Sequence, residues 1–148
     1  MKNQYFGDIN DYKKYGLLRA IIYATDFRVL VNWMLTPDDG GPDGKKTEYL
    51  NKPRRYSSHD PELFATLYKL VIEQGQRHTE AIEDTDLLRN AIYFSLKTPD
   101  ELFMRSEWFD LSTGEFGPVD LVFLDPDKGL EVASVPIGRD SSSKYLYW

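Results

Sequence analysis

Apolar side chains recur at two spacings along the chain, and each spacing predicts a type of secondary structure. Residues 9–24 show the helical spacing, and the apolar positions are Ile9, Tyr12, Leu17, Ile21 and Ile22. Asp8 or Asn10 is placed to cap the start of this helix, and Gly16 weakens its middle. Three shorter runs are rich in β-branched and aromatic residues, which is typical of buried strands. They are residues 28–35, 91–97 and 119–124.

Helical patterns lie between the first and second of these runs and between the second and third. Asp60 can cap a helix that begins at Pro61 and ends before Gly75. A shorter helix is expected at 78–89, and another over 98–111 with Thr98 as its cap.

Strands that alternate with helices predict an α/β fold with a mainly parallel sheet. We expect residues 1–148 to form a single α/β domain, a Rossmann-like three-layer sandwich. Three strands make a small sheet for this architecture. The tyrosines and tryptophan at the end look like the start of another element. We therefore expect either that the domain is minimal or that the chain lacks a C-terminal part of it.

Composition narrows the class of protein. The 148 residues, 41% of them hydrophobic, are enough to build a core. No apolar run approaches the roughly 18 residues of a membrane span, and the first residues lack the apolar region of a secretory signal. The absence of cysteine removes disulfides and thiolate metal sites, and it indicates a cytoplasmic protein.

Charge is unevenly distributed along the chain. The formal net charge of −6 argues mildly against a nucleic-acid binder, whose surface is normally basic. Basic residues nevertheless gather near the start and in the middle of the chain, so local basic patches coexist with an acidic total. These residues are Lys13, Lys14, Arg19, Lys45, Lys46, Lys52, Arg54 and Arg55.

Two acidic loops follow predicted strands, one after Leu35 and one after Leu124. In open α/β sheets, ligands bind beyond the carboxyl ends of the strands. Neighbouring strands would therefore bring five carboxylates into one crevice: Asp38, Asp39, Asp43, Asp125 and Asp127. The same residues are also common in turns that have no function. That interpretation is weaker for Asp125, which directly continues an apolar run.

Several other chemistries fit the sequence less well. GGPDGKKT lacks the spacing of a phosphate-binding loop, and prolines and aspartates interrupt the glycines that a cofactor loop needs. His59 and His78 are the only histidines, so a zinc site lacks ligands. A magnesium site made of carboxylates stays open. The favoured chemistry is an aspartate that activates water or stabilises a cationic, sugar-like transition state.

Two motifs resemble nucleic-acid adenine methyltransferases of the ribosomal-RNA type. YFGDINDYKKYGLLR is similar to the segment that precedes the first strand of those enzymes. LDPDKG lies where Rossmann-type methyltransferases carry Asp-Pro-Pro-Tyr, the loop that grips the amino group of a flipped base. Asp125 and Pro126 match this motif, whereas Asp127 and Lys128 do not.

Residues 5–148 also resemble a widespread, largely uncharacterised bacterial family. Its members share YFGD, DYxKYGLLR, WMLTPDDG, DPDNGLEV and SSKYLYW. All five motifs are recognisable here, with Lys128 in place of the usual asparagine. Members usually continue beyond the last motif, and the resemblance implies no specific activity.

Three functions follow from these observations. The first is a hydrolytic DNA N-glycosylase that excises modified bases without a cofactor, which would suit defence against phages. The second is a nucleic-acid base methyltransferase that uses S-adenosylmethionine, and the third is a non-catalytic Rossmann-like binding module. Nucleic acid is the expected partner, with no role for a membrane or a metal.

The first hypothesis assigns a role to each candidate residue. The expected catalytic residues are Asp125, Asp127, Asp38 and Asp8. The expected substrate-binding residues are Tyr5, Phe6, Gly7, Asn10, Trp33, Asp39, Lys13, Lys14, Arg54, Arg55 and Lys128. Tyr5, Phe6 or Trp33 would stack on an extruded base, and the basic residues would contact phosphates.

Overall fold

A computed structural model describes residues 1–114 and 116–147. The contacts divide the chain into two compact units. The sheet unit comprises Met1–Lys2, Phe27–Pro37 and Ala91–Trp148. The helical unit comprises Asn3–Asp26 and Asp38–Asn90. Each unit is described by itself below.

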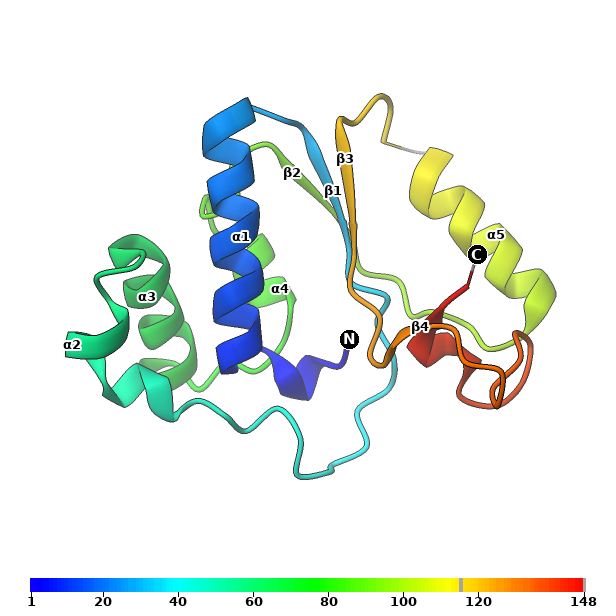
Figure 1. Ribbon diagram of the computed structural model, residues 1–148, viewed down its shortest axis with the longest axis horizontal. Helices are drawn as coiled ribbons and strands as arrows, with labels where there is room; N and C mark the ends of the chain where they lie inside the picture. Colours follow the sequence, from blue (N-terminus) through cyan, green and yellow to red (C-terminus); the bar gives the residue numbers. More distant parts are fainter. Residues whose placement is uncertain (115, 148) are drawn as a thin grey trace. The chain divides into compact units, whose positions relative to one another are not determined.

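The sheet unit is built on three parallel strands, β1 (Val29–Asn32), β2 (Ala91–Phe94) and β3 (Leu121–Leu124). Their order is β2-β1-β3, with β1 in the middle (Figure 1). The register pairs Asn32 with both Phe94 and Leu124, so the three strands end level with one another. The prediction of an α/β fold with a small parallel sheet is confirmed.

Each of the three strands is shorter than predicted. The central strand stops at Asn32 because the Asn32 side chain accepts a hydrogen bond from the backbone N–H of Met34, at 2.9 Å. Met34 then adopts a left-handed conformation with φ +46°. This side-chain-to-backbone bond replaces the ladder, so the apolar residues that follow Asn32 leave the strand.

Helix α5 (Leu102–Gly114) packs on one face of the sheet. Its Trp108 ring lies 5.4 Å from the Phe94 ring, and both belong to a buried cluster with Leu30 and Met34. The prediction that Thr98 caps this helix is wrong. The Glu101 carboxylate accepts from the first N–H groups of the helix instead, those of Phe103 and Met104, at 3.1 and 2.8 Å.

The sheet unit also contains a second sheet, made of two strands. Strand β4 (Gly129–Leu130) pairs in parallel with β5 (Tyr145–Leu146), which follows the short helix η4 (Ser142–Lys144). The Asp100 carboxylate holds the start of this segment, because it accepts from the N–H groups of Ser141 and Ser143 at 3.1 and 2.6 Å.

The helical unit centres on α1 (Ile9–Thr25), close to the predicted range. Asp8 is the N-cap, as expected, and accepts from the backbone N–H groups of Asn10 and Asp11 at 2.7 and 3.2 Å. Helix α3 (Pro61–Leu67) continues as a π-helical turn. The remaining short elements of this unit are η1 (Asn3–Tyr5), η2 (Glu48–Asn51), α2 (Pro53–Tyr56), the π-helical turn η3 (Tyr68–Glu73) and α4 (Glu80–Glu83).

The helix predicted at 78–89 is reduced to one turn, α4.

Within residues 1–114 and 116–147, no helix combines the length and the apolar character needed to cross a bilayer.

Candidate functional site

Polar groups gather at the carboxyl edge of the three-stranded sheet. The backbone nitrogen of Met1 donates to the carbonyl oxygens of Met34 and Asp125, at 3.0 and 2.9 Å. The N–H of Asp125 in turn donates to the carbonyl oxygen of Asn32, at 3.0 Å. The first two residues of the chain therefore lie across the ends of β1 and β3, and Lys2 is brought to this edge.

Asp127 is the most unusual carboxylate at this edge. Its side chain is 1% exposed, and its Oδ2 lies 3.5 Å from the Nζ of Lys2, whose side chain is 4% exposed. Within the part of the chain that the structure describes, no hydrogen bond reaches either oxygen of Asp127. Buried carboxylates normally accept several hydrogen bonds. Asp127 is therefore a buried carboxylate whose lone pairs no described residue satisfies by a hydrogen bond.

Two further buried polar atoms at the ends of the neighbouring strands lack hydrogen bonds. They are the Nδ2 of Asn32 and the Oγ1 of Thr98, on residues that are 0% and 5% exposed; neither has a partner among the described residues. Thr98 is fixed beside β1 because its N–H donates to the carbonyl oxygen of Leu35, at 2.7 Å. The edge thus offers buried donors as well as a buried acceptor.

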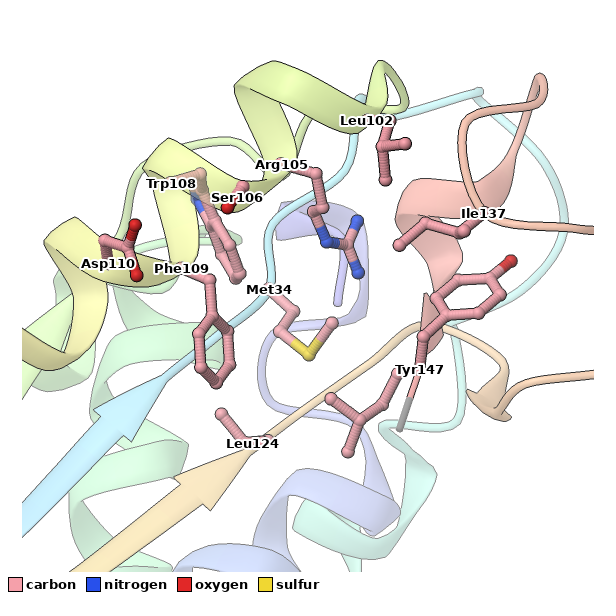
Figure 2. A pocket seen from close by; sticks show the side chains of 11 residues that line it. Met34, Leu102, Arg105, Ser106, Trp108, Phe109, Asp110, Leu124, Ile137 and Tyr147 are labelled. Atoms are coloured by element: carbon pink, nitrogen blue, oxygen red, sulfur yellow. The ribbon is translucent and has the colours of Figure 1, made fainter.

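A cavity of about 290 Å³ opens between the sheet and α5 (Figure 2). Two lining residues connect the cavity to the carboxyl edge. Leu124 is the last residue of β3, and Met34 lies just beyond the end of β1. Trp108 and Phe109 form one apolar wall, and the Arg105 side chain points into the space. This volume lies at the lower end of the range of small-molecule pockets, roughly 300–1,000 Å³.

Arg105 is the one cation that lines this cavity in the described part of the chain. It donates to the carbonyl oxygens of Pro99 and Tyr145, at 3.1 and 2.7 Å. Its guanidinium also lies 5.3 Å from the Trp108 ring centre. Burial lowers the pKa of Arg105, and the nearby Tyr147 and Asp100 oppose this change. A fixed cation beside an aromatic wall suits a planar, electron-rich ligand.

The other predicted carboxylates lie in the helical unit and have structural partners there. Asp8 is buried and caps α1. Asp38 and Asp39 are exposed, and both bind Gln4: Asp38 accepts from its backbone N–H at 3.1 Å, and Asp39 from its side-chain amide at 3.0 Å. These bonds hold the loop after residue 37 to the segment before α1.

The aromatic residues predicted to stack on a base differ in exposure. Phe6 and Trp33 are both 0% exposed. Phe6 lies 6.5 Å from Tyr15, and Trp33 stacks on Tyr93 at 6.1 Å. A fully buried ring offers no face to an extruded base, so the stacking role predicted for Phe6 and Trp33 does not fit. Tyr5 is partly exposed.

Gly7 has a packing role. Its φ is +75°, and a Cβ atom there would come within 2.3 Å of Val71. Glycine is therefore required by the backbone and by the close approach of Val71, without any ligand. Asn10 is exposed on the first turn of α1.

Most of the predicted basic contacts form no ion pair with residues of the described part of the chain. They are Lys13, Arg54, Arg55 and Lys128, and all four are exposed. Lys14 forms an ion pair with Asp11, at 3.4 Å. Arg55 lies over the Tyr56 ring, at 5.4 Å from its centre.

Three residues of the carboxyl edge were not predicted. Asn32 had a signal, since it is a polar residue inside the apolar run VLVNWML. Thr98 was assigned to a helix cap that Glu101 provides instead. Lys2 had no signal, because its place depends on the hydrogen bonds of Met1 to two distant strands.

No protein-family model, curated protein or solved structure matches this chain. Among residues 1–114 and 116–147, no three or more histidine, cysteine, aspartate or glutamate side chains are grouped to hold a metal ion.

Proposed function

We propose that the protein is a nucleic-acid base-processing enzyme, a hydrolytic N-glycosylase that excises a modified base from DNA. The observation that carries this proposal is the Asp127 carboxylate, which is buried, close to Lys2 and without a hydrogen bond from the described residues. The topology adds support. In a sheet of order β2-β1-β3 the connections reverse direction between β1 and β3, and ligands of doubly wound sheets bind at such a point.

The proposed reaction needs one base and one stabilising charge. Water attacks C1′ of the sugar, and the Asp127 carboxylate accepts a proton from that water. The bond between C1′ and the base nitrogen breaks, the base departs with the electron pair, and the proton that Asp127 accepted from water passes to the base nitrogen. The Asp125 carboxylate stabilises the positive charge that develops on the sugar. The products are a free base and an abasic site.

The cavity beside α5 provides a place for the extruded base. Its apolar wall of Trp108 and Phe109 can stack on the ring. Arg105, the cation of this cavity, can bond to polar atoms on the edge of the base.

A substrate screen tests this proposal. The protein is incubated with natural, hydroxymethylated and glucosylated DNA, and alkali then converts abasic sites into strand breaks. We expect Asp127→Asn and Asp125→Asn to lower the rate about 10²–10⁴-fold. Asp140→Asn, an exposed aspartate of the same unit, is the matched control. Strand breaks on none of these substrates, or full activity of Asp127→Asn, would overturn the proposal.

Base methylation with S-adenosylmethionine is the second candidate, because the same strand order suits nucleotide-like cofactors. The glycines after β1 give it less support. Gly44 packs against Tyr5, since a Cβ there would come within 2.5 Å of that ring. Calorimetry separates the two activities: binding of S-adenosylmethionine supports methyl transfer, and no heat at millimolar ligand removes it. A protein that binds DNA without either activity would be the non-catalytic binding module.

A further inference from the structure

The helical unit contains a second cavity, of about 540 Å³, lined by residues of α1 and of the segment from α2 to α3. Its walls include Tyr12, Tyr23, Tyr56, Lys13 and His59, and Gly16 forms part of its floor. All of these residues belong to one unit. We call this cavity the tyrosine groove.

Packing does not explain why residue 16 is a glycine. It lies in the middle of α1, where glycine costs roughly 0.5–1 kcal/mol relative to alanine. Its backbone is helical, so no left-handed conformation requires glycine. A Cβ there would meet only Leu63 Cδ2, at 3.7 Å, which is an ordinary contact. A longer side chain would instead fill the groove, so glycine keeps the groove open.

The walls of the groove are held in place. The Tyr12 hydroxyl donates to the carbonyl oxygen of Tyr56, at 2.8 Å, and the two rings meet edge to face at 6.5 Å. Tyr23 is 54% exposed, and the guanidinium groups of Arg19 and Arg89 lie 5.3 and 4.7 Å from its ring centre. The exposed Tyr23 and the partly exposed Tyr56 supply aromatic surface of the kind on which bases stack.

Exposed basic side chains lie beside the groove. Asp60 is its one acidic lining residue in the described chain, and Arg19 neutralises it at 2.7 Å while also binding Glu62 at 2.6 Å. Lys13 remains exposed at the wall. Helix α2 contributes Tyr56 to the groove and exposes Arg55 and Arg54, one and two residues earlier. An anionic strand could therefore run along α2.

We propose that the tyrosine groove binds a single-stranded segment of nucleic acid, with a base against the tyrosines and phosphates on Lys13, Arg54 and Arg55. This inference rests on the proposed function for its class of ligand. It adds a site that holds the strand on the helical unit and that takes no part in bond cleavage.

Fluorescence anisotropy with a labelled single-stranded DNA oligonucleotide and the full chain tests the groove. Gly16→Leu fills the floor and is expected to weaken binding about tenfold or more. Gly16→Ala adds only the Cβ that has room, so it is the matched control and should bind within about twofold of the wild type. No binding by the wild type at low salt, or equal binding by all three proteins, would overturn the inference.

A second variant tests the groove even if Gly16→Leu fails to fold. Arg54→Gln with Arg55→Gln changes two exposed side chains, and it should reduce the slope of log affinity against log salt by about 0.7 for each lost contact. An unchanged slope contradicts the proposal, as does equal competition by duplex DNA. Binding that depends on the groove without any abasic product would refute the glycosylase alone. Base excision with groove-independent binding would refute the groove alone.

Discussion

Both units bury aspartates, but they use them differently. In the helical unit, Asp8 accepts two backbone hydrogen bonds as a helix cap, and Asp11 accepts from Gly7 N–H at 3.1 Å and from the Tyr15 hydroxyl at 3.4 Å. At the carboxyl edge of the sheet unit, Asp127 is as deeply buried yet accepts no hydrogen bond from the described residues.

We propose that this difference separates the structural carboxylates from a functional one. A buried polar group without partners costs about 1–3 kcal/mol, and proteins tolerate that cost mainly at functional sites. Burial alone therefore does not identify a site in this protein. In our proposal the contrast between satisfied and unsatisfied buried carboxylates identifies it, and substitutions in both units can break or sharpen the comparison.

The largest effect is expected at Lys2. Lys2→Met leaves the Asp127 charge buried without its ion-pair partner, which should lower the free energy of unfolding by about 3–5 kcal/mol. Replacing both residues, Lys2→Met with Asp127→Leu, should restore most of that stability, because two apolar side chains need no partner. Chemical denaturation measures both proteins. A double variant as unstable as Lys2→Met would show that Asp127 stabilises the fold by itself.

Gly7→Ala should be nearly as damaging in the helical unit. The left-handed φ of +75° and the 2.3 Å approach to Val71 together predict a loss of about 3 kcal/mol. Thermal unfolding measures the change, and Gly75→Ala, with φ +67° and no atom within 4 Å, is the matched control for the backbone term alone. Equal losses in the two variants would contradict the packing role of Gly7.

Asp100 extends the comparison within the sheet unit, because its carboxylate is well satisfied. Burial raises its pKa, but hydrogen bonds from Ser143, Ser141 and Ser142 outweigh burial and lower the pKa overall. Asp100→Ala should destabilise the segment around η4 by about 2 kcal/mol. Hydrogen exchange of residues 141–146 measures this loss.

The sign of the pH dependence follows from the lowered pKa of Asp100. Its contribution to stability is fully present above the unfolded-state pKa, about 3.9. It is lost as the pH falls through the lower folded-state pKa. Wild type and Asp100→Ala should therefore converge in exchange rate under strongly acidic conditions. A difference that persists there would point to packing rather than charge.

The smallest effect is expected at the cap of α1. Asp8→Ala removes two hydrogen bonds to backbone N–H groups and should cost about 1 kcal/mol. Asp8→Ser, which keeps a capping oxygen, should recover most of it in the same denaturation experiment. A loss in Asp8→Ser as large as in Asp8→Ala would argue against capping as the role of Asp8.

The local parts of the fold could be predicted from the sequence. Helix α1 and its Asp8 cap follow from helical spacing and from a capping residue just before it. The three strands follow from apolar runs. The strand ends could not be predicted, since β1 stops where the Asn32 side chain captures the N–H of Met34. The pairing of Gly129 with Tyr145 joins two-residue strands far apart in the chain, and such short strands carry no periodicity.

The candidate site could also be predicted only in part, because a local pattern does not record contacts between distant segments. Asp125 and Asp127 stand at the end of an apolar run, so their place at the carboxyl edge could be inferred. Lys2 and Thr98 arrive there through hydrogen bonds of the backbone to distant strands, which no local pattern records. Phe6 and Trp33 show the opposite error, because aromatic side chains suited to stacking are equally suited to a core.

The most direct test of the account compares two asparagine substitutions in the sheet unit on the best DNA substrate. Asp127→Asn changes the unsatisfied carboxylate, and Asp100→Asn changes the satisfied one. We predict that base release per folded molecule falls about 10²–10⁴-fold in Asp127→Asn and stays within about twofold of the wild type in Asp100→Asn. Equal rates for the two variants would contradict the claim that the buried, unsatisfied carboxylate performs the chemistry.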